Sequence, residues 1–212
     1  MRKTFLAITL FLAFSKAALA QFGNCTASEM RTYVDSATGN TITMLTDTMK
    51  NDRFLYQTDP MWTADGKYLL FRSSSRGNDK EVESTLPNGE KRKWTPTQIY
   101  FIEMATGKII QATEGPNLGS AFLANKTNRM FVSRKEKENW NMYVMDLNKF
   151  FADVKQGKVG KPSAYETFIG TFPTEMGRPG GYAVDCNDDY AYITVEREGT
   201  EEEKERMMKN AF

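Results

Sequence analysis

Three segments of the chain share one pattern of apolar and polar positions. Each has an apolar stretch, a short polar turn and a second apolar stretch. They cover residues 62–73, 123–134 and 184–195. When the segments are aligned without gaps, Leu69 coincides with Met130 and Met130 with Ala191, so the spacing is 61 residues both times. Two equal spacings indicate an internal repeat, and each copy has the pattern of a β-hairpin.

The turns and the sequence around them predict the fold class. The first turn contains Asp65-Gly66, and Asp-Gly between apolar runs is a strong hairpin signal because glycine tolerates positive φ. Further strand-like stretches follow the first two copies, at 98–113 and at 140–147 with 164–168. Four strands per repeated unit are typical of a β-propeller blade, so we expect an all-β fold of four-stranded antiparallel sheets. The blades are expected near residues 59–113, 119–168 and 180–196.

The repeat is longer than the ~40–50 residues of common blades, which predicts insertions. We expect one at residues 76–96, as a charged loop or extra hairpin, and one at 149–162 with a short helical turn. Residues 31–46 have a strand–turn–strand pattern and are interpreted as the outer, closing strands of another blade. A closed ring needs at least about four blades, so residues 21–212 are expected to form part of a larger propeller whose other strands lie beyond Phe212.

The N-terminal residues 1–20 have the layout of a secretory signal peptide. Arg2 and Lys3 precede an apolar run over residues 5–14, and Ala18-Leu19-Ala20 ends the segment. A membrane anchor is the alternative, but the run is shorter than the roughly 20 residues that span a bilayer. We therefore expect cleavage after Ala20, and a periplasmic or secreted protein that does not stay in the membrane.

Composition narrows the possible chemistry. The net charge of +1 gives no reason to expect nucleic acid or an anionic membrane as partner. The two cysteines, Cys25 and Cys186, can pair in an oxidising compartment, although their positions do not require it. The sequence contains no histidine. Ser-His-Asp and Cys-His catalysis are therefore excluded within this chain, and so are most zinc sites.

Four stretches resemble the oligogalacturonate lyase family. They are Asp35-Ser-Ala-Thr-Gly39 to Leu45-Thr46, Tyr56 to Gly66, Asp146 to Asp153, and Thr171 to Gly177. The resemblance runs from about Arg31 to Glu196 and covers the N-terminal half of the family. It implies a seven-bladed propeller that cleaves pectin-derived oligogalacturonides by β-elimination. It also implies a divalent metal, usually manganese, held by histidines and a glutamine in the family's C-terminal half. Because this chain has no histidine, no ligand can be assigned to it, and we expect no metal bound by this part and an inactive isolated chain.

Four charged residues are candidates for binding the acidic oligosaccharide that the resemblance implies as partner. They are Arg72, Arg134, Glu175 and Arg178. A bidentate arginine suits a carboxylate, although the alternative, a plain surface charge at a strand end, is the commoner case. Trp94 and Trp140 are possible platforms for a sugar ring, whereas the repeat register places Trp62 in the core. No catalytic residue is assigned.

Two other functions fit the same sequence. One is a propeller of the Tol-system type that binds a sugar or a peptide without turnover. The other is an inactive, truncated fragment. The oligomeric state is left open by the sequence.

Overall fold

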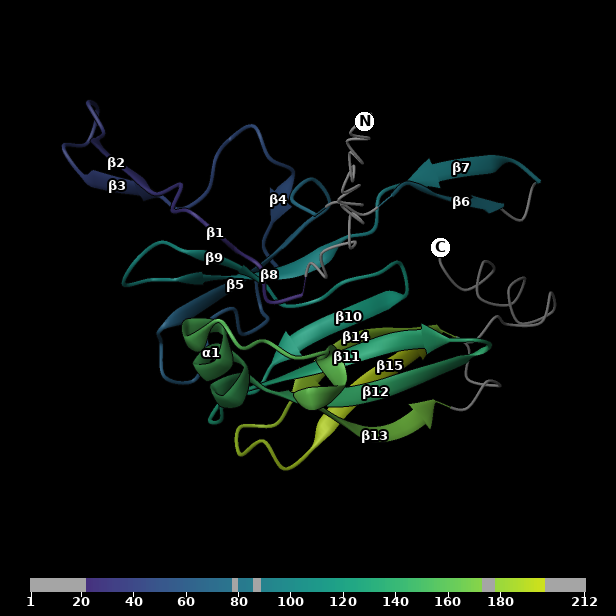
Figure 1. Cartoon of the computed structure of the whole chain (residues 1–212). Helices are drawn as coiled ribbons and strands as arrows, with labels where there is room; N and C mark the ends of the chain where they lie inside the picture. The colour runs from purple at the N-terminus through teal and green to yellow at the C-terminus, as the bar shows by residue number, and fades with distance from the viewer. Residues whose placement is uncertain (1–21, 78–79, 86–88, 173–177, 197–212) are drawn as a thin grey trace, which may run out of the picture.

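The protein is mostly β-structure in several antiparallel sheets (Figure 1). The computed structural model describes residues 22–77, 80–85, 89–172 and 178–196. The predicted signal peptide lies outside these residues. Among the described helices, none combines the length and the apolar character needed to cross a membrane. The expectation of an antiparallel, mostly β fold is confirmed.

The first sheet contains five strands in the order β1-β9-β8-β5-β4. They are β4 (Asp52–Arg53), β5 (Tyr68–Ser73), β8 (Gln98–Glu103), β9 (Ile109–Gln111) and β1 (Cys25–Thr26). Strands β4, β5, β8 and β9 lie side by side in chain order, as in a meander, with residues 74–97 inserted between β5 and β8. The N-terminal segment adds β1 to the outer edge, a fifth strand that the repeat pattern did not predict.

The second sheet contains four strands in chain order. They are β10 (Leu118–Leu123), β11 (Arg129–Glu136), β12 (Asn139–Asp146) and β13 (Glu166–Phe172). Both its strand number and its antiparallel pairing match the pattern of the second repeat.

Three further hairpins each form a two-stranded sheet. They are β14 (Arg178–Val184) with β15 (Ala191–Glu196), β2 (Arg31–Val34) with β3 (Thr41–Met44), and β6 (Val82–Thr85) with β7 (Lys91–Trp94). The β2–β3 pair is the segment interpreted as closing strands, and within the described chain its strands pair only with each other. The β6–β7 pair is the insertion expected at residues 76–96, and it projects from the first sheet (Figure 1).

The 61-residue spacing corresponds to equivalent strands. Leu69 lies in β5, Met130 in β11 and Ala191 in β15. The turns before these strands are joined by hydrogen bonds from one unit to the next. Asn128 Oδ1 accepts a bond from the backbone N of Asp65 at 3.2 Å. The repeated hairpins therefore lie beside one another in chain order.

The insertion between β12 and β13 is a helix rather than a single turn. Helix α1 spans Leu147–Gln156, and a 3-10 turn, η1, spans Pro162–Ala164. Asp146 caps the helix by accepting a bond from the N of Lys149 at 3.0 Å. Gly157, at φ 67°, ends it in the left-handed conformation that glycine adopts without strain.

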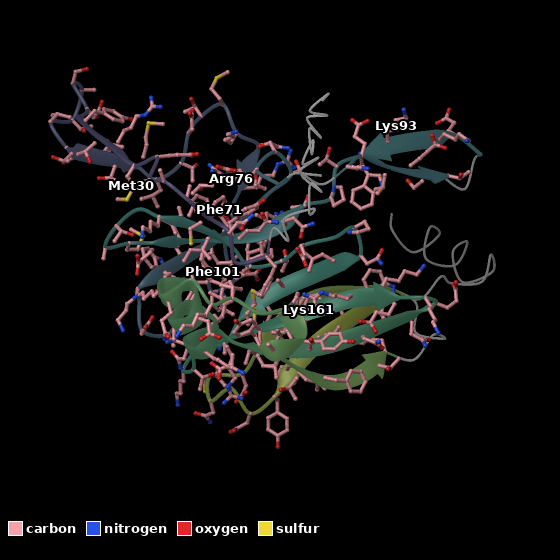
Figure 2. All side chains as sticks on the ribbon, viewed as in Figure 1. Met30, Phe71, Arg76, Lys93, Phe101 and Lys161 are labelled. Carbon is pink, nitrogen blue, oxygen red and sulfur yellow. The ribbon has the colours of Figure 1, made fainter. Side chains whose placement is uncertain are left out.

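The main core lies between the first two sheets and α1. Its buried side chains are Tyr68, Leu70, Phe101, Leu123, Met130, Val132, Met145, Leu147, Phe150 and Phe151, with others around them. Phe101 lies beside α1 (Figure 2). Its ring meets that of Phe151 edge-on at 5.1 Å. A second cluster joins the second sheet to β14–β15, where the Phe122 ring stacks on Phe131 and on Tyr182, both at 4.9 Å. Aromatic packing thus fixes each sheet against the next.

The structure corrects one expectation for a single residue and answers one question that the sequence left open, the pairing of the two cysteines. Trp62 is 47% exposed and not a core residue. The chain meets β5 there through one isolated bridge to Leu69, so Trp62 is not held in a continuous strand. Cys25 and Cys186 are both exposed and unpaired, because one lies at the edge of the first sheet and the other in the β14–β15 turn.

Candidate functional site

Two arginines on adjacent strands form the centre of the candidate site. Strands β4 and β5 pair antiparallel, with Arg53 directly opposite Arg72. Both side chains are exposed, and in the part of the chain that the structure describes neither forms an ion pair. Like charges placed directly opposite one another in a sheet are destabilising. An anion bound between them would relieve that repulsion.

The acid next to Arg53 in the sequence, Asp52, does not pair with it. Asp52 precedes Arg53 and therefore points to the opposite face of β4. Its carboxylate accepts bonds from Arg76 at 2.8 and 2.5 Å, and Arg76 also bonds Glu29 at 2.9 and 2.6 Å. The Arg76 side chain is only 6% exposed. Its bonds to the two carboxylates raise the pKa of Arg76. The same bonds lower the pKa of Glu29. This cluster fixes β4 and engages the adjacent carboxylate, so that none of the described acids pairs with Arg53.

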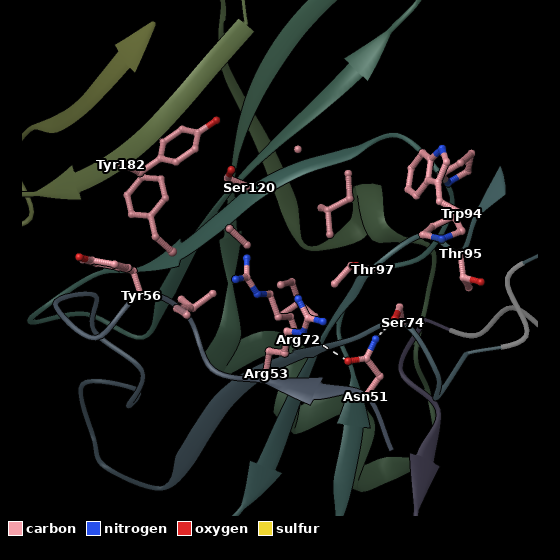
Figure 3. Close-up of a pocket in the computed structure, with 18 of the residues that line it drawn as sticks. Asn51, Arg53, Tyr56, Arg72, Ser74, Trp94, Thr95, Thr97, Ser120 and Tyr182 are labelled. Atoms are coloured by element: carbon pink, nitrogen blue, oxygen red, sulfur yellow. Dashed lines mark hydrogen bonds between the residues drawn. The ribbon is translucent and has the colours of Figure 1, made fainter. Parts of the chain in front are cut away.

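Asn51 positions the Arg53 side chain. Its Oδ1 accepts a bond from Arg53 Nε at 3.2 Å (Figure 3). The Asn51 side chain in turn donates from Nδ2 to Ser74 Oγ at 2.8 Å, and its backbone N donates to Ser75 Oγ at 2.7 Å. The guanidinium is therefore held by a neutral group, which restricts its orientation and leaves its charge available.

The two arginines lie in a pocket of about 850 Å³. The pocket is lined by residues of the first sheet, β7, β10 and β14, so it forms where several sheets meet. Among the described residues that line it, the charged ones are Arg53, Arg72, Arg92, Lys93 and Asp59. Four cations against one carboxylate make the pocket strongly positive.

Aromatic rings lie at both ends of this pocket. Trp94 lies at one end, and Tyr56 and Tyr182 lie at the other, with Arg53 and Arg72 between them (Figure 3). Trp94 is 37% exposed and Tyr56 is 67% exposed, so both rings are accessible to a ligand. Cations that alternate with exposed rings suit an elongated ligand that carries carboxylates and has apolar faces.

The pocket brings together only part of the predicted set. Arg72 and Trp94 line it. Arg134 instead forms a two-bond ion pair with Glu166, one bond being 2.6 Å from Nη2 to Oε1, and it lies over the ring of Tyr143. Since Glu166 already neutralises the guanidinium, Arg134 is not available to a ligand in this arrangement.

The remaining candidates are not among the described residues that line the pocket. Arg178 begins β14, where its backbone is in register with Glu196. Glu175 lies outside the described residues. Trp140 lies in β12 and is not among the residues that line the pocket.

Sequence reasoning missed Arg53, Arg92 and Lys93. Arg53 lies on a strand of two residues, and only the pairing of β4 with β5 shows that it faces Arg72. Arg92 and Lys93 belong to the run Lys91-Arg-Lys-Trp94 inside the charged insertion. A basic run that ends in tryptophan is a signal for anion binding that the sequence did carry.

The described residues do not fit a manganese site. They contain no cluster of three or more histidine, cysteine, aspartate or glutamate side chains, and the sequence has no histidine. In the pocket itself, Asp59 is the single carboxylate among the described lining residues, and one carboxylate beside four cations does not hold a divalent ion. No step of a reaction is assigned to a metal here.

Comparisons with known proteins support the fold. No family model matches the sequence, and no curated protein matches it. Two solved structures are similar in fold. One is an oligogalacturonate lyase in complex with manganese (20% identity, TM-score 0.54, covering 79% of this chain and 36% of that one). The other is an oligogalacturonate lyase from Vibrio parahaemolyticus (21% identity, TM-score 0.53, covering 78% of this chain and 35% of that one).

The family resemblance inferred from the sequence is confirmed at the level of the fold. At this identity the likeness concerns the fold alone. The chain spans about a third of the length of the two structures that it resembles.

Proposed function

We propose that this chain is part of a propeller similar to oligogalacturonate lyases, and that its positive pocket binds the carboxylates of a pectin-derived acidic oligosaccharide. The sheets are then blades of a seven-bladed ring with β2–β3 as a closing pair. Residues 1–20 direct export to the periplasm or the medium. Cleavage by β-elimination is the activity proposed for the protein to which this pocket belongs, with manganese as its metal.

The observation that carries the proposal is the facing pair Arg53 and Arg72 in a pocket whose described lining residues include one carboxylate, that of Asp59. The ligand-free protein bears the repulsion of this pair. A uronate carboxylate placed between the guanidiniums accepts hydrogen bonds from both, and such charge-assisted bonds are among the strongest in proteins. The exposed rings at the two ends supply apolar contact for sugar faces.

The same contact suits β-elimination. In that reaction a base removes the C5 proton of a uronate, the electrons form the C4–C5 double bond, and the C4–O bond breaks with its electrons leaving on oxygen. Guanidiniums on the carboxylate stabilise the negative charge that develops as the proton leaves. Because the described residues offer neither a metal cluster nor a histidine, we assign to them recognition of the uronate and not proton removal.

The test is the binding of trigalacturonate by the chain, measured by calorimetry, with its methyl ester as a neutral ligand of the same shape. We expect the free acid to bind and the ester to bind far more weakly. Arg72→Gln should weaken binding of the acid by about 10- to 150-fold, the factor that ~1.5–3 kcal/mol of charge-assisted hydrogen bonding corresponds to.

Arg129→Gln is the matched control. Arg129 is an exposed arginine on a strand, but it faces Asp146 and does not line the pocket. Equal affinity for acid and ester, or equal effects of the two substitutions, would contradict the proposed binding site. The ultraviolet absorbance of unsaturated product, followed in the same mixtures with manganese, separates binding from cleavage. A manganese-dependent rise would show that the chain itself carries the catalytic groups.

A further inference from the structure

The β6–β7 hairpin is not needed to build the first sheet. Strands β5 and β8 pair directly with each other along their whole length, from Tyr68↔Glu103 to Ser73↔Gln98. The chain therefore leaves the sheet after Ser73 and re-enters it at Gln98, which pairs with Ser73. The intervening hairpin adds no strand to the sheet and projects away from it, with Lys93 on the projecting part (Figure 2).

The hairpin does contribute to the pocket. Arg92, Lys93 and Trp94 of β7 line it. Trp94 lies at the end opposite Tyr56 and Tyr182 (Figure 3). All residues of β7 are exposed, and within the described chain neither Arg92 nor Lys93 takes part in an ion pair. The adjacent Lys91 differs, because it pairs with Glu83 at 2.8 Å and does not line the pocket.

The pocket therefore has two cationic centres on different elements. One is the Arg53–Arg72 pair on the sheet, and the other is Arg92 with Lys93 on the inserted hairpin. A volume of about 850 Å³ lies near the upper end of the roughly 300–1,000 Å³ range of pockets for drug-sized ligands, and it exceeds the size of one sugar. Two cationic centres on different elements offer separate contacts to two carboxylates of one ligand.

We infer that the β6–β7 hairpin is a second binding point that selects for ligand length. The sheet arginines bind one uronate, and Arg92 and Lys93 bind the carboxylate of another unit while Trp94 stacks on a sugar ring. This inference rests on the proposed function, since it assumes uronate ligands. The preferred ligand is then an oligomer of at least two uronates, because the second contact forms within an already bound molecule and adds to its affinity.

The test compares galacturonate with trigalacturonate on the full chain by calorimetry. We expect wild type to bind trigalacturonate at least about tenfold more tightly than galacturonate. Combining Arg92→Gln with Trp94→Ala should weaken trigalacturonate by about tenfold and leave galacturonate within about twofold of wild type. Lys91→Gln, which removes a charge from the same strand outside the pocket, should leave both ligands within about twofold. Because the substituted residues are exposed, circular dichroism and the thermal midpoint should match those of wild type.

Two results would overturn the inference while the proposed function stands. One is equal affinity of wild type for the two ligands. The other is an equal loss for both ligands in the hairpin variant, which would make the hairpin part of a single site. Failure of the proposed function has a different signature, because Arg72→Gln would then leave the binding of both ligands unchanged.

Discussion

Asp188 joins the β14–β15 hairpin to the second sheet, and its replacement tests how the repeated units are held together. Its carboxylate accepts bonds from the backbone N of Asn125 at 2.6 Å, Lys126 at 2.9 Å and Thr127 at 2.8 Å. It also accepts one from Thr127 Oγ1 at 2.8 Å. Partial burial tends to raise the pKa of Asp188, but these bonds outweigh it and the pKa is lowered. The carboxylate is thus stabilised in its charged form.

The conservative change is Asp188→Asn. Asp188 has φ 64°, and asparagine tolerates this left-handed conformation, so the backbone need not change. Three of the four bonds fall on Oδ2, so the amide oxygen can keep these, and the amide nitrogen then faces the N–H of Asn125. A hydrogen bond to a charged group contributes ~1.5–3 kcal/mol, and partial exposure reduces this through water. We expect a loss of about 1–2 kcal/mol, which lowers the thermal midpoint by about 3–6 °C.

The assay is urea and thermal unfolding of wild type, Asp188→Asn and Asp189→Asn. Asp189 is an exposed aspartate of the same turn and controls for loss of one charge. Because the folded pKa of Asp188 lies below the unfolded value, its contribution is complete above about pH 4 and is lost as the pH falls through the folded pKa. The difference between wild type and Asp188→Asn should therefore be full at pH 7 and shrink in acid. Equal stability of the two variants at pH 7, or a difference that persists at the lowest pH, would refute this reasoning.

Three other substitutions are expected to have defined effects on stability. Arg72→Gln should raise stability by about 0.2–1 kcal/mol at low salt, because it removes the repulsion with Arg53; a lower thermal midpoint than wild type contradicts this. Glu166→Gln should cost about 2–4 kcal/mol in urea unfolding, because the half-buried Arg134 loses its carboxylate, and a loss under ~1 kcal/mol argues against it. Phe150→Ala should cost about 3–5 kcal/mol, since this fully buried ring packs in the main core against the rings of Phe22, Phe151 and Tyr165; unchanged urea unfolding is the contrary result.

Much of the local structure followed from short stretches of sequence. Asp65-Gly66 predicted a hairpin turn, and Gly66 has φ 68° in the structure. The helix was expected only as a turn within residues 149–162, although its capping residues, Asp146 and Gly157, were already present in the sequence. Such features depend on neighbours in the chain, and therefore they can be inferred without knowing the fold.

The candidate site was predicted less completely. Arg72 and Trp94 were identified, but Arg53 was not, because its role depends on the register between β4 and β5. Arg134 was selected by its place in the repeat, and the structure adds its partner Glu166 from β13, 32 residues further along the chain. Neither contact follows from local sequence, because both are made between strands.

The sequence by itself determined the antiparallel β class, the repeated hairpins and the resemblance in fold, since these arise from periodicity and turn chemistry. Only the tertiary structure decided which charges are neutralised and which are available. Arg76 and Arg134 are held by carboxylates, whereas Arg53 and Arg72 face each other in the pocket and form no ion pair with any residue that the structure describes. The physical reason is that electrostatic energy depends on distance in space and on exposure to water, and neither is encoded in the spacing of residues along the chain.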